Sequence, residues 1–179
     1  MPEIKKQNIK SNFFNNKKAD ADKVASALLG KFICRKFDDG TVLRWCIVET
    51  EAYYDNEEVT YKNPMFHGVG EWCPYNGMLM INCISKEGKE GKEGNDNILI
   101  RSVDCVKGPC KLAEILKIKE IKNEIIKQSV IDNEKLWIED YGFTVKEEQD
   151  VRTGIVKKDE NDEHLKRKKH YATSIIFPL

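Results

Sequence analysis

The sequence predicts a single α+β domain in which an antiparallel or mixed, curved β-sheet is flanked by helices. Strand-like segments occur in pairs separated by short turn signals, which is typical of hairpins. Two other segments carry apolar residues at helical intervals. A chain of 179 residues, 40% of them hydrophobic, can bury one substantial core.

The first predicted hairpin ends in acidic residues. Its strands are residues 32–37 and 47–53, and Asp39-Gly40 between them favours a type I′ turn. Because strand side chains alternate, Glu49, Glu51 and Tyr53 should share one face. Two acids and a tyrosine at a strand end indicate a site, although a solvated acidic strand face explains them equally well.

The remaining elements follow from periodicity and turn residues. In chain order we expect a helix over 24–29 ending at Gly30, strands over 79–84 and 97–103 joined by a Glu-Gly-Lys loop, a helical region from Gly108-Pro109 to residue 126, and short strands over 136–139 and 151–156.

Composition narrows the class of protein without fixing its partner. The formal net charge is zero, so any nucleic acid would have to bind local basic clusters. No apolar run approaches the roughly 20 residues of a membrane span, and no apolar segment marks a secretory signal. We therefore expect an intracellular protein with no membrane partner, with residues 1–19 as a basic flexible arm and residues 20–179 as one domain.

Six cysteines and three histidines are the usual candidates for metal ligands. No Cys-x-x-Cys pair is present, and the spacing is wider than zinc sites require. We expect no metal and no cofactor, and we take most of the cysteines as small buried apolar residues.

An ordered set of motifs resembles the alkyladenine DNA glycosylase family, whose members are also called 3-methyladenine or methylpurine DNA glycosylases. The resemblance runs from about residue 21 to about residue 155 and suggests a divergent member. It rests on Leu28-Leu29-Gly30-Lys31, the Asp39-Gly40 hairpin, the Glu49-Thr50-Glu51-Ala52-Tyr53 motif, Met65-Phe66, residues 75–82, Leu99-Ile100-Arg101, Gly108-Pro109-Cys110-Lys111-Leu112, residues 136–139 and Arg152-Thr153-Gly154-Ile155.

The resemblance implies a role for each matching residue. Glu51 corresponds to the carboxylate that activates water, and Arg101 to the arginine that helps hold that water. Tyr53 corresponds to an aromatic wall of the base pocket, and Asn82 to the asparagine that helps reject guanine. Tyr75 resembles the wedge that intercalates into DNA. Without the motif order, Arg101 would be read as a surface ion pair, Asn82 as a strand-end cap and Tyr75 as a half-buried core aromatic.

The implied activity is that of a monofunctional DNA-3-methyladenine glycosylase in base excision repair. Such an enzyme flips an alkylated purine out of double-stranded DNA and hydrolyses its N-glycosidic bond, which leaves an abasic site. The expected form is a monomer. Phosphate contacts are expected from residues 5–18, Arg35-Lys36, Lys157-Lys158 and residues 166–169.

Several departures from the family pattern affect the pocket. The histidine that the family carries after its catalytic glutamate is missing from residues 57–62. The stretch before Tyr75 is short, so Trp72 is the candidate for the missing aromatic wall and His67 a weaker one. Asn76 is an extra residue that could shift the wedge by one position.

These departures lead us to expect a narrowed or altered base range that favours cationic 3-methyladenine or 7-methylguanine. Two alternatives remain open. One is a catalytically decayed relative that binds damaged DNA. The other is an unrelated hydrolase or interaction module that shares the Glu-Thr-Glu-Ala-Tyr motif.

Overall fold

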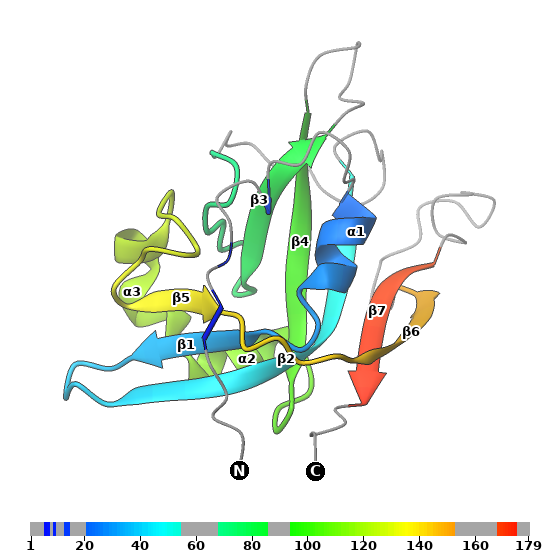
Figure 1. The fold of residues 1–179 in the computed structure, drawn as a ribbon. Coiled ribbons are helices and arrows are strands. Elements are labelled where there is room, and N and C mark those ends of the chain that lie inside the picture. The colour runs from blue at the N-terminus through cyan, green and yellow to red at the C-terminus, as the bar shows by residue number, and fades with distance from the viewer. Residues whose placement is uncertain are drawn as a thin grey trace, which may run out of the picture.

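The computed structural model describes residues 6–7, 9, 13–14, 21–54, 68–85, 94–152 and 168–174. Helices and strands mix along the chain (Figure 1). Their bounds are α1 (Ala21–Ala27), β1 (Phe32–Lys36), β2 (Val42–Tyr53), β3 (Met80–Ser85), β4 (Gly94–Val103), α2 (Pro109–Ile115), α3 (Ile118–Ile125), β5 (Leu136–Glu139), β6 (Lys146–Val151) and β7 (Lys168–Ser174). None of these helices is long and apolar enough to cross a membrane.

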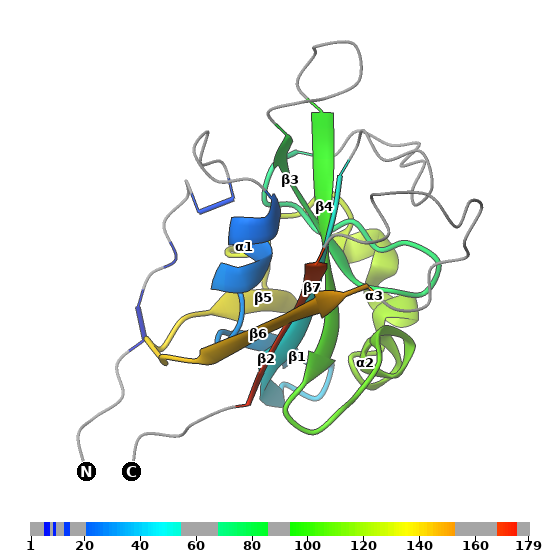
Figure 2. The same ribbon diagram turned by 90° about the vertical axis from the view of Figure 1, so that its right-hand side faces the viewer.

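The strands form one antiparallel sheet organised around β2. The order is β3-β4-β2-β1-β5, with β7 also paired to β2 and β6 paired to β7. The 12 residues of β2 allow its first half to pair with β1 and its second half to pair with both β4 and β7. The predicted α+β class with a curved antiparallel sheet is confirmed. Seen from the side, the sheet lies between α1 and the pair α2 and α3 (Figure 2).

The two faces of the second half of β2 have different chemistry, as the alternation predicted. One face meets α1, where Thr50 Oγ1 donates to the Ala25 carbonyl at 2.8 Å and Ala52 joins the main hydrophobic core. The other face carries Glu51 and Tyr53, whose side chains are hydrogen-bonded to each other. The apolar face therefore anchors the strand and leaves the polar face for chemistry.

Two turns differ from the sequence-based expectation. Residues 38–40 form a loop in which the Phe37 N–H donates to the Thr41 carbonyl and the Gly40 N–H donates to the Phe37 carbonyl. Of these residues only Gly40 has a positive φ, 84°. The predicted type I′ turn at Asp39-Gly40 is therefore wrong, because that turn needs positive φ at both central residues. Asn76 and Gly77 meet this condition instead, with φ of 46° and 74°.

The helical region after Gly108 also differs, because it is broken into α2 and α3. Lys117 adopts a left-handed conformation (φ 52°) between them, which a continuous helix does not allow. Of the strand predicted over 151–156, Val151 is the last residue of β6 and Arg152 lies beyond it. Residues 153–156 lie outside the described residues, so that part stays a prediction. The sequence analysis missed β7.

Some predictions concern residues that are only partly described. Of the proposed arm, Phe14 is buried in the main core and Lys6 pairs with Glu139 at 2.9 Å. Part of residues 1–19 therefore packs on the domain. The domain boundary at residue 20 stays a prediction. The segment that lacks the family histidine, His67, and the basic clusters at 157–158 and 166–167 lie outside the described residues.

Candidate active site

The polar face of β2 brings two carboxylates to one arginine. Arg101, on the neighbouring strand β4, donates from Nη1 to Glu51 Oε1 at 3.2 Å, and its Nε lies 3.6 Å from Glu49 Oε2. The Glu51 side chain has no solvent exposure, whereas that of Arg101 is 22% exposed. A buried carboxylate needs such a partner, because an unpaired charge in the interior is costly. The structure thus brings together the two residues predicted to be catalytic.

Tyr53 also contacts Glu51 on this face. Its hydroxyl donates to Glu51 Oε2 at 2.7 Å. Burial, and then the negative charge of Glu51, raise the pKa of the Tyr53 phenol, so it stays protonated and remains a donor. The guanidinium of Arg152 lies 4.6 Å from the centre of the Tyr53 ring and donates to the Ala52 carbonyl at 2.9 Å.

Arg152 is a site neighbour that the sequence analysis did not single out. It follows β6, distant in sequence from Tyr53, and it is only 7% exposed. The sequence feature that could have indicated Arg152 is its place in the Arg-Thr-Gly-Ile stretch that resembles the family. A single arginine in that stretch does not indicate which aromatic ring it contacts.

Glu49 is held by groups from two neighbouring strands, β4 and β7. Ser102 Oγ donates to Glu49 Oε2 at 2.6 Å, and the backbone N–H of Gly108, at the start of α2, donates to the same Ser102 hydroxyl at 3.1 Å. His170, on β7, has its Nε2 3.9 Å from Glu49 Oε2. Glu49 is thus tied into the sheet more firmly than a solvated acidic face would require.

Asn82 lies in the same row of the sheet as Tyr53. Asn82 on β3 pairs in register with Asn97 on β4, and Asn97 pairs with Tyr53 on β2. Residues directly opposite each other on adjacent strands point to the same face. Asn82 is fully buried, and its Nδ2 donates to the Gly68 carbonyl at 3.4 Å. The predicted pocket asparagine is therefore near the predicted pocket tyrosine.

Tyr75 lies at one end of a tight hairpin. Tyr75 and Met78 exchange backbone hydrogen bonds of 3.0 and 2.8 Å, which leaves Asn76 and Gly77 exposed at the tip. The side chains of Tyr53, Tyr75 and Met78 each pack against a small buried cluster of Cys73, Met80 and Leu99. The predicted wedge and the predicted pocket wall therefore share one cluster, and the Tyr75 ring is half-buried.

Trp72 has a different environment from the other predicted site residues. It is fully buried in the main hydrophobic core, and its indole Nε1 donates to the Leu136 carbonyl at 2.8 Å. The structure does not bring Trp72 into the cluster with Tyr53. A large ring with its polar atom bonded inside the core is the usual arrangement for a structural tryptophan.

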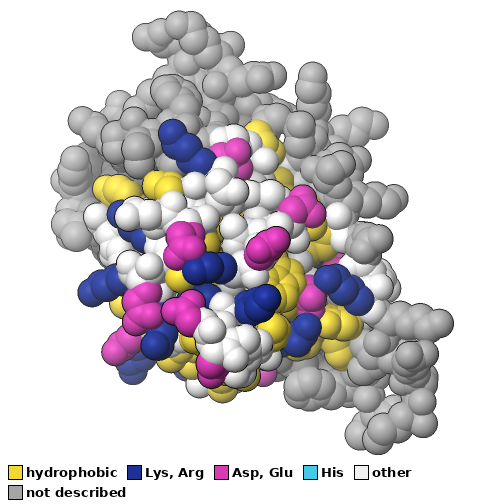
Figure 3. All heavy atoms as spheres, turned by 90° about the vertical axis from the view of Figure 1, so that its left-hand side faces the viewer, with side chains coloured by type: hydrophobic (Ala, Val, Ile, Leu, Met, Phe, Trp, Pro, Cys, Tyr) yellow, Lys and Arg dark blue, Asp and Glu magenta, His cyan; other side chains and the backbone are white. Residues whose placement is uncertain are grey.

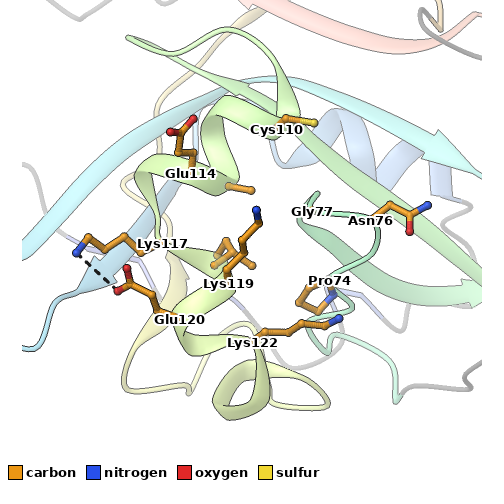
Figure 4. A pocket seen from close by; sticks show the side chains of 11 residues that line it. Pro74, Asn76, Gly77, Cys110, Glu114, Lys117, Lys119, Glu120 and Lys122 are labelled. Atoms are coloured by element: carbon orange, nitrogen blue, oxygen red, sulfur yellow. Dashed lines mark ion pairs between the residues drawn. The ribbon is translucent and has the colours of Figure 1, made fainter.

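A groove of about 800 Å³ lies between the Tyr75 hairpin and the α2–α3 corner. Lys119 and Lys122 extend toward the hairpin, whereas Lys117 turns away to Glu120, with which it pairs at 3.6 Å (Figure 4). The groove is lined by Pro74, Asn76, Gly77, Cys110, Ala113, Glu114, Lys117, Ile118, Lys119, Glu120 and Lys122. Glu51, Tyr53, Asn82 and Arg101 are not among its lining residues, so the groove is separate from the acid–arginine pair.

The surface around α3 has mixed charge. Basic and acidic side chains alternate over this face without a large patch of one sign (Figure 3). Over the ranges that the structure describes, no group of three or more His, Cys, Asp and Glu side chains could hold a metal ion. All six cysteines are described; none forms a disulfide, and four of them are buried.

The site therefore consists of a buried acid–arginine pair on one face of an antiparallel sheet. A hairpin that begins at a tyrosine carries the predicted wedge. The profile described as methylpurine-DNA glycosylase matches residues 13–107, which are 95 of the 179 residues. This match places the chain among the DNA glycosylases, hydrolases of base excision repair.

The chain belongs to the methylpurine-DNA glycosylase family, as its motif order suggested. The comparison with curated proteins gives no match. The matched residues include Glu51, Tyr53, Tyr75, Asn82 and Arg101, and the match ends just before α2.

Proposed function

We propose that this protein is a monofunctional glycosylase that rotates an alkylated purine out of duplex DNA and hydrolyses its N-glycosidic bond. The observation that carries the proposal is the pairing of buried Glu51 with Arg101 at 3.2 Å within the family-matched segment. In this proposal Glu51 and Arg101 are the catalytic residues, Tyr53 and Asn82 belong to the base pocket, and Tyr75 intercalates.

The chemistry needs one carboxylate and one water. As the bond between C1′ and the base nitrogen breaks, the sugar develops oxocarbenium character and the base leaves with the bonding electron pair. The negative charge of Glu51 stabilises that cation, and Glu51 then takes a proton from the water that attacks C1′. Arg101 helps hold this water. The product is an abasic site with both strands uncut, because no amine forms a bond to the sugar.

Access to Glu51 requires a local rearrangement. Because Glu51 has no exposed surface, neither a sugar nor a water can reach it in the arrangement described here. Arg101 is the better candidate to move, since it is partly exposed and a second carboxylate, Glu49, lies 3.6 Å from its Nε. We propose that substrate entry shifts Arg101 toward Glu49 and uncovers Glu51.

The base pocket bears on lesion preference. An aromatic wall favours a positively charged purine by about 0.5–2 kcal/mol. Arg152 already occupies one face of the Tyr53 ring, so a base could stack only on the opposite face, and that face attracts a cation less strongly. We nevertheless propose that the set of damaged bases that the protein removes is narrowed to 3-methyladenine and 7-methylguanine. Both leave without acid assistance. Comparable excision rates for hypoxanthine and 3-methyladenine would contradict it.

The activity is tested by single-turnover release of 3-methyladenine from methylated duplex DNA. Removal of a general base typically costs about 10²–10⁴-fold in rate, so we expect Glu51→Gln to lose activity by that factor while it still binds DNA. Glu139→Gln is the matched control, because it changes another buried glutamate, the last residue of β5. It should retain the rate at a temperature where it is folded. A Glu51→Gln variant as fast as the unmodified protein would refute the assignment.

The alternative of a catalytically decayed DNA-binding relative is favoured by the complete burial of Glu51. The same assay separates the two functions. Failure of both the unmodified protein and Glu51→Gln to release any base, together with preferential binding of methylated duplex by both, would support the binding protein.

We propose that the groove beside the hairpin receives a DNA phosphate backbone. Lys119 and Lys122 are both exposed and extend into it (Figure 4). If each lysine contacts one phosphate, then Lys119→Ala and Lys122→Ala should each lower the slope of log affinity against log salt by about 1. Lys146→Ala, on β6, is the control and should leave the slope unchanged. Unchanged slopes for both groove variants would exclude these contacts.

The wider setting is also proposed. We take the protein to act as a monomer on double-stranded DNA inside the cell, without cofactor or metal. Residues 1–19 would form a basic arm, and residues 20–179 would form the catalytic domain.

A further inference from the structure

Strand β7 brings a histidine to the acid–arginine pair from beyond the family-matched segment. His170 is the register partner of Glu51 in the pairing of β7 with β2, and directly opposite residues have Cβ atoms about 4.5–5.5 Å apart on one face. The imidazole Nε2 lies 3.9 Å from Glu49 Oε2, and the side chain is 15% exposed. His170 is thus near both carboxylates, although the motif that resembles the family does not contain it.

The charged groups that face His170 come from three elements. Glu49 and Glu51 lie on β2, Arg101 lies on β4, and Asp150 is the register partner of His170 on β6. Arg101 is shared between Glu49 and Glu51, so any group that competes for Glu49 changes how strongly Arg101 is held at Glu51. His170 is such a group, because its protonation state decides whether it is a cation beside Glu49.

We propose that His170 is a positioning residue that sets the location of Arg101 through Glu49; this inference rests on the function proposed above. When His170 is protonated it pairs with Glu49, and Arg101 remains at Glu51. When His170 is neutral, Glu49 is available to Arg101, which then leaves Glu51 more readily. The second arrangement uncovers the carboxylate that the reaction needs.

The expected consequence is a pH dependence of excision in the range where histidine titrates. An unperturbed histidine loses its proton near pH 6.5, so excision should rise by about two- to fivefold, the range of a partly exposed ion pair, between pH 5.5 and 7.5. Loss of the rise in a His170 variant would assign it to the histidine.

The test compares pH profiles of single-turnover excision for two substitutions. His170→Gln keeps a neutral hydrogen-bonding group and should remove the rise while it keeps the high-pH rate. His170→Lys keeps a cation near Glu49 and should hold the rate at the low-pH level. His164→Gln, which removes the preceding histidine in the chain, is the control and should keep the profile of the unmodified protein. An unaltered profile in His170→Gln, or an equal loss at all pH values in both variants, would overturn the inference.

An NMR titration tests the same inference without activity. The Arg101 Nε–H resonance should shift between pH 5.5 and 7.5 in the unmodified protein, and neither His170→Gln nor Glu49→Gln should show this shift. A pH-independent Arg101 resonance in the unmodified protein would exclude the coupling. If the protein excises no base, the proposed function fails, whereas this titration still decides whether His170 positions Arg101.

Discussion

Two buried glutamates, Glu51 and Glu139, show how differently one fold can treat the same side chain. Glu139 ends β5 and is only 3% exposed. Its carboxylate accepts hydrogen bonds from Lys6, Arg44, Trp137 and Tyr141 at 2.7–2.9 Å. Burial acts to raise its pKa, but these four donors outweigh burial and hold the pKa of Glu139 well below its usual range.

At Glu51 one cation lies between two carboxylates. Glu139 pairs with two cations, Lys6 and Arg44, whereas Arg101 contacts both Glu49 and Glu51. We therefore expect Glu139 to contribute mainly to stability, and in the function proposed above Glu51 acts in the chemistry.

The largest expected effect is a loss of stability when the Glu139 carboxylate is removed. Glu139→Gln leaves Lys6 and Arg44 without their carboxylate partner. We expect the free energy of unfolding to fall by about 2–4 kcal/mol, as measured by urea denaturation at pH 7. Glu51→Gln should lower it by less, because it also relieves the repulsion between two acids. A larger loss for Glu51→Gln would remove the distinction.

The same contrast should appear as a dependence of stability on pH. Because the folded-state pKa of Glu139 is lowered, its contribution is fully present above the unfolded value of about 4.3 and is lost as the pH falls toward the folded value. The stability gap between the unmodified protein and Glu139→Gln should therefore narrow as urea titrations move from pH 6 through 4 to 3. A gap that stays constant over this range would mean that the donors do not hold the carboxylate as proposed.

A smaller effect is expected on the excision rate alone, from a change at Arg101. Arg101 contacts Glu51 and Glu49 through different nitrogens of its planar group, which a lysine ammonium cannot reproduce. We expect Arg101→Lys to slow excision by about tenfold while unfolding changes by less than about 1 kcal/mol. Arg44→Lys is the counterpart at Glu139 and should leave the excision rate unchanged. Equal rates for the two variants would argue against a special role for the shared arginine.

The sequence by itself determined most of the strands and the face on which the candidate site lies. Alternation in β2 separates Glu51 and Tyr53 from Thr50 and Ala52, because neighbouring strand residues point to opposite faces whatever the rest of the chain does. The motif order also indicated the family and the proximity of Arg101, since β2 and β4 are neighbours in the sheet. These features depend on local geometry and on the family resemblance.

Only the tertiary structure decided which distant residues surround those acids. His170 reaches Glu49 through the pairing of β7 with β2, and Arg152 stacks on Tyr53 from the end of β6. Trp72, expected in the pocket, is instead buried in the core. Strand register and core packing depend on residues far apart in the chain, so local periodicity carries no information about which side chains they bring together.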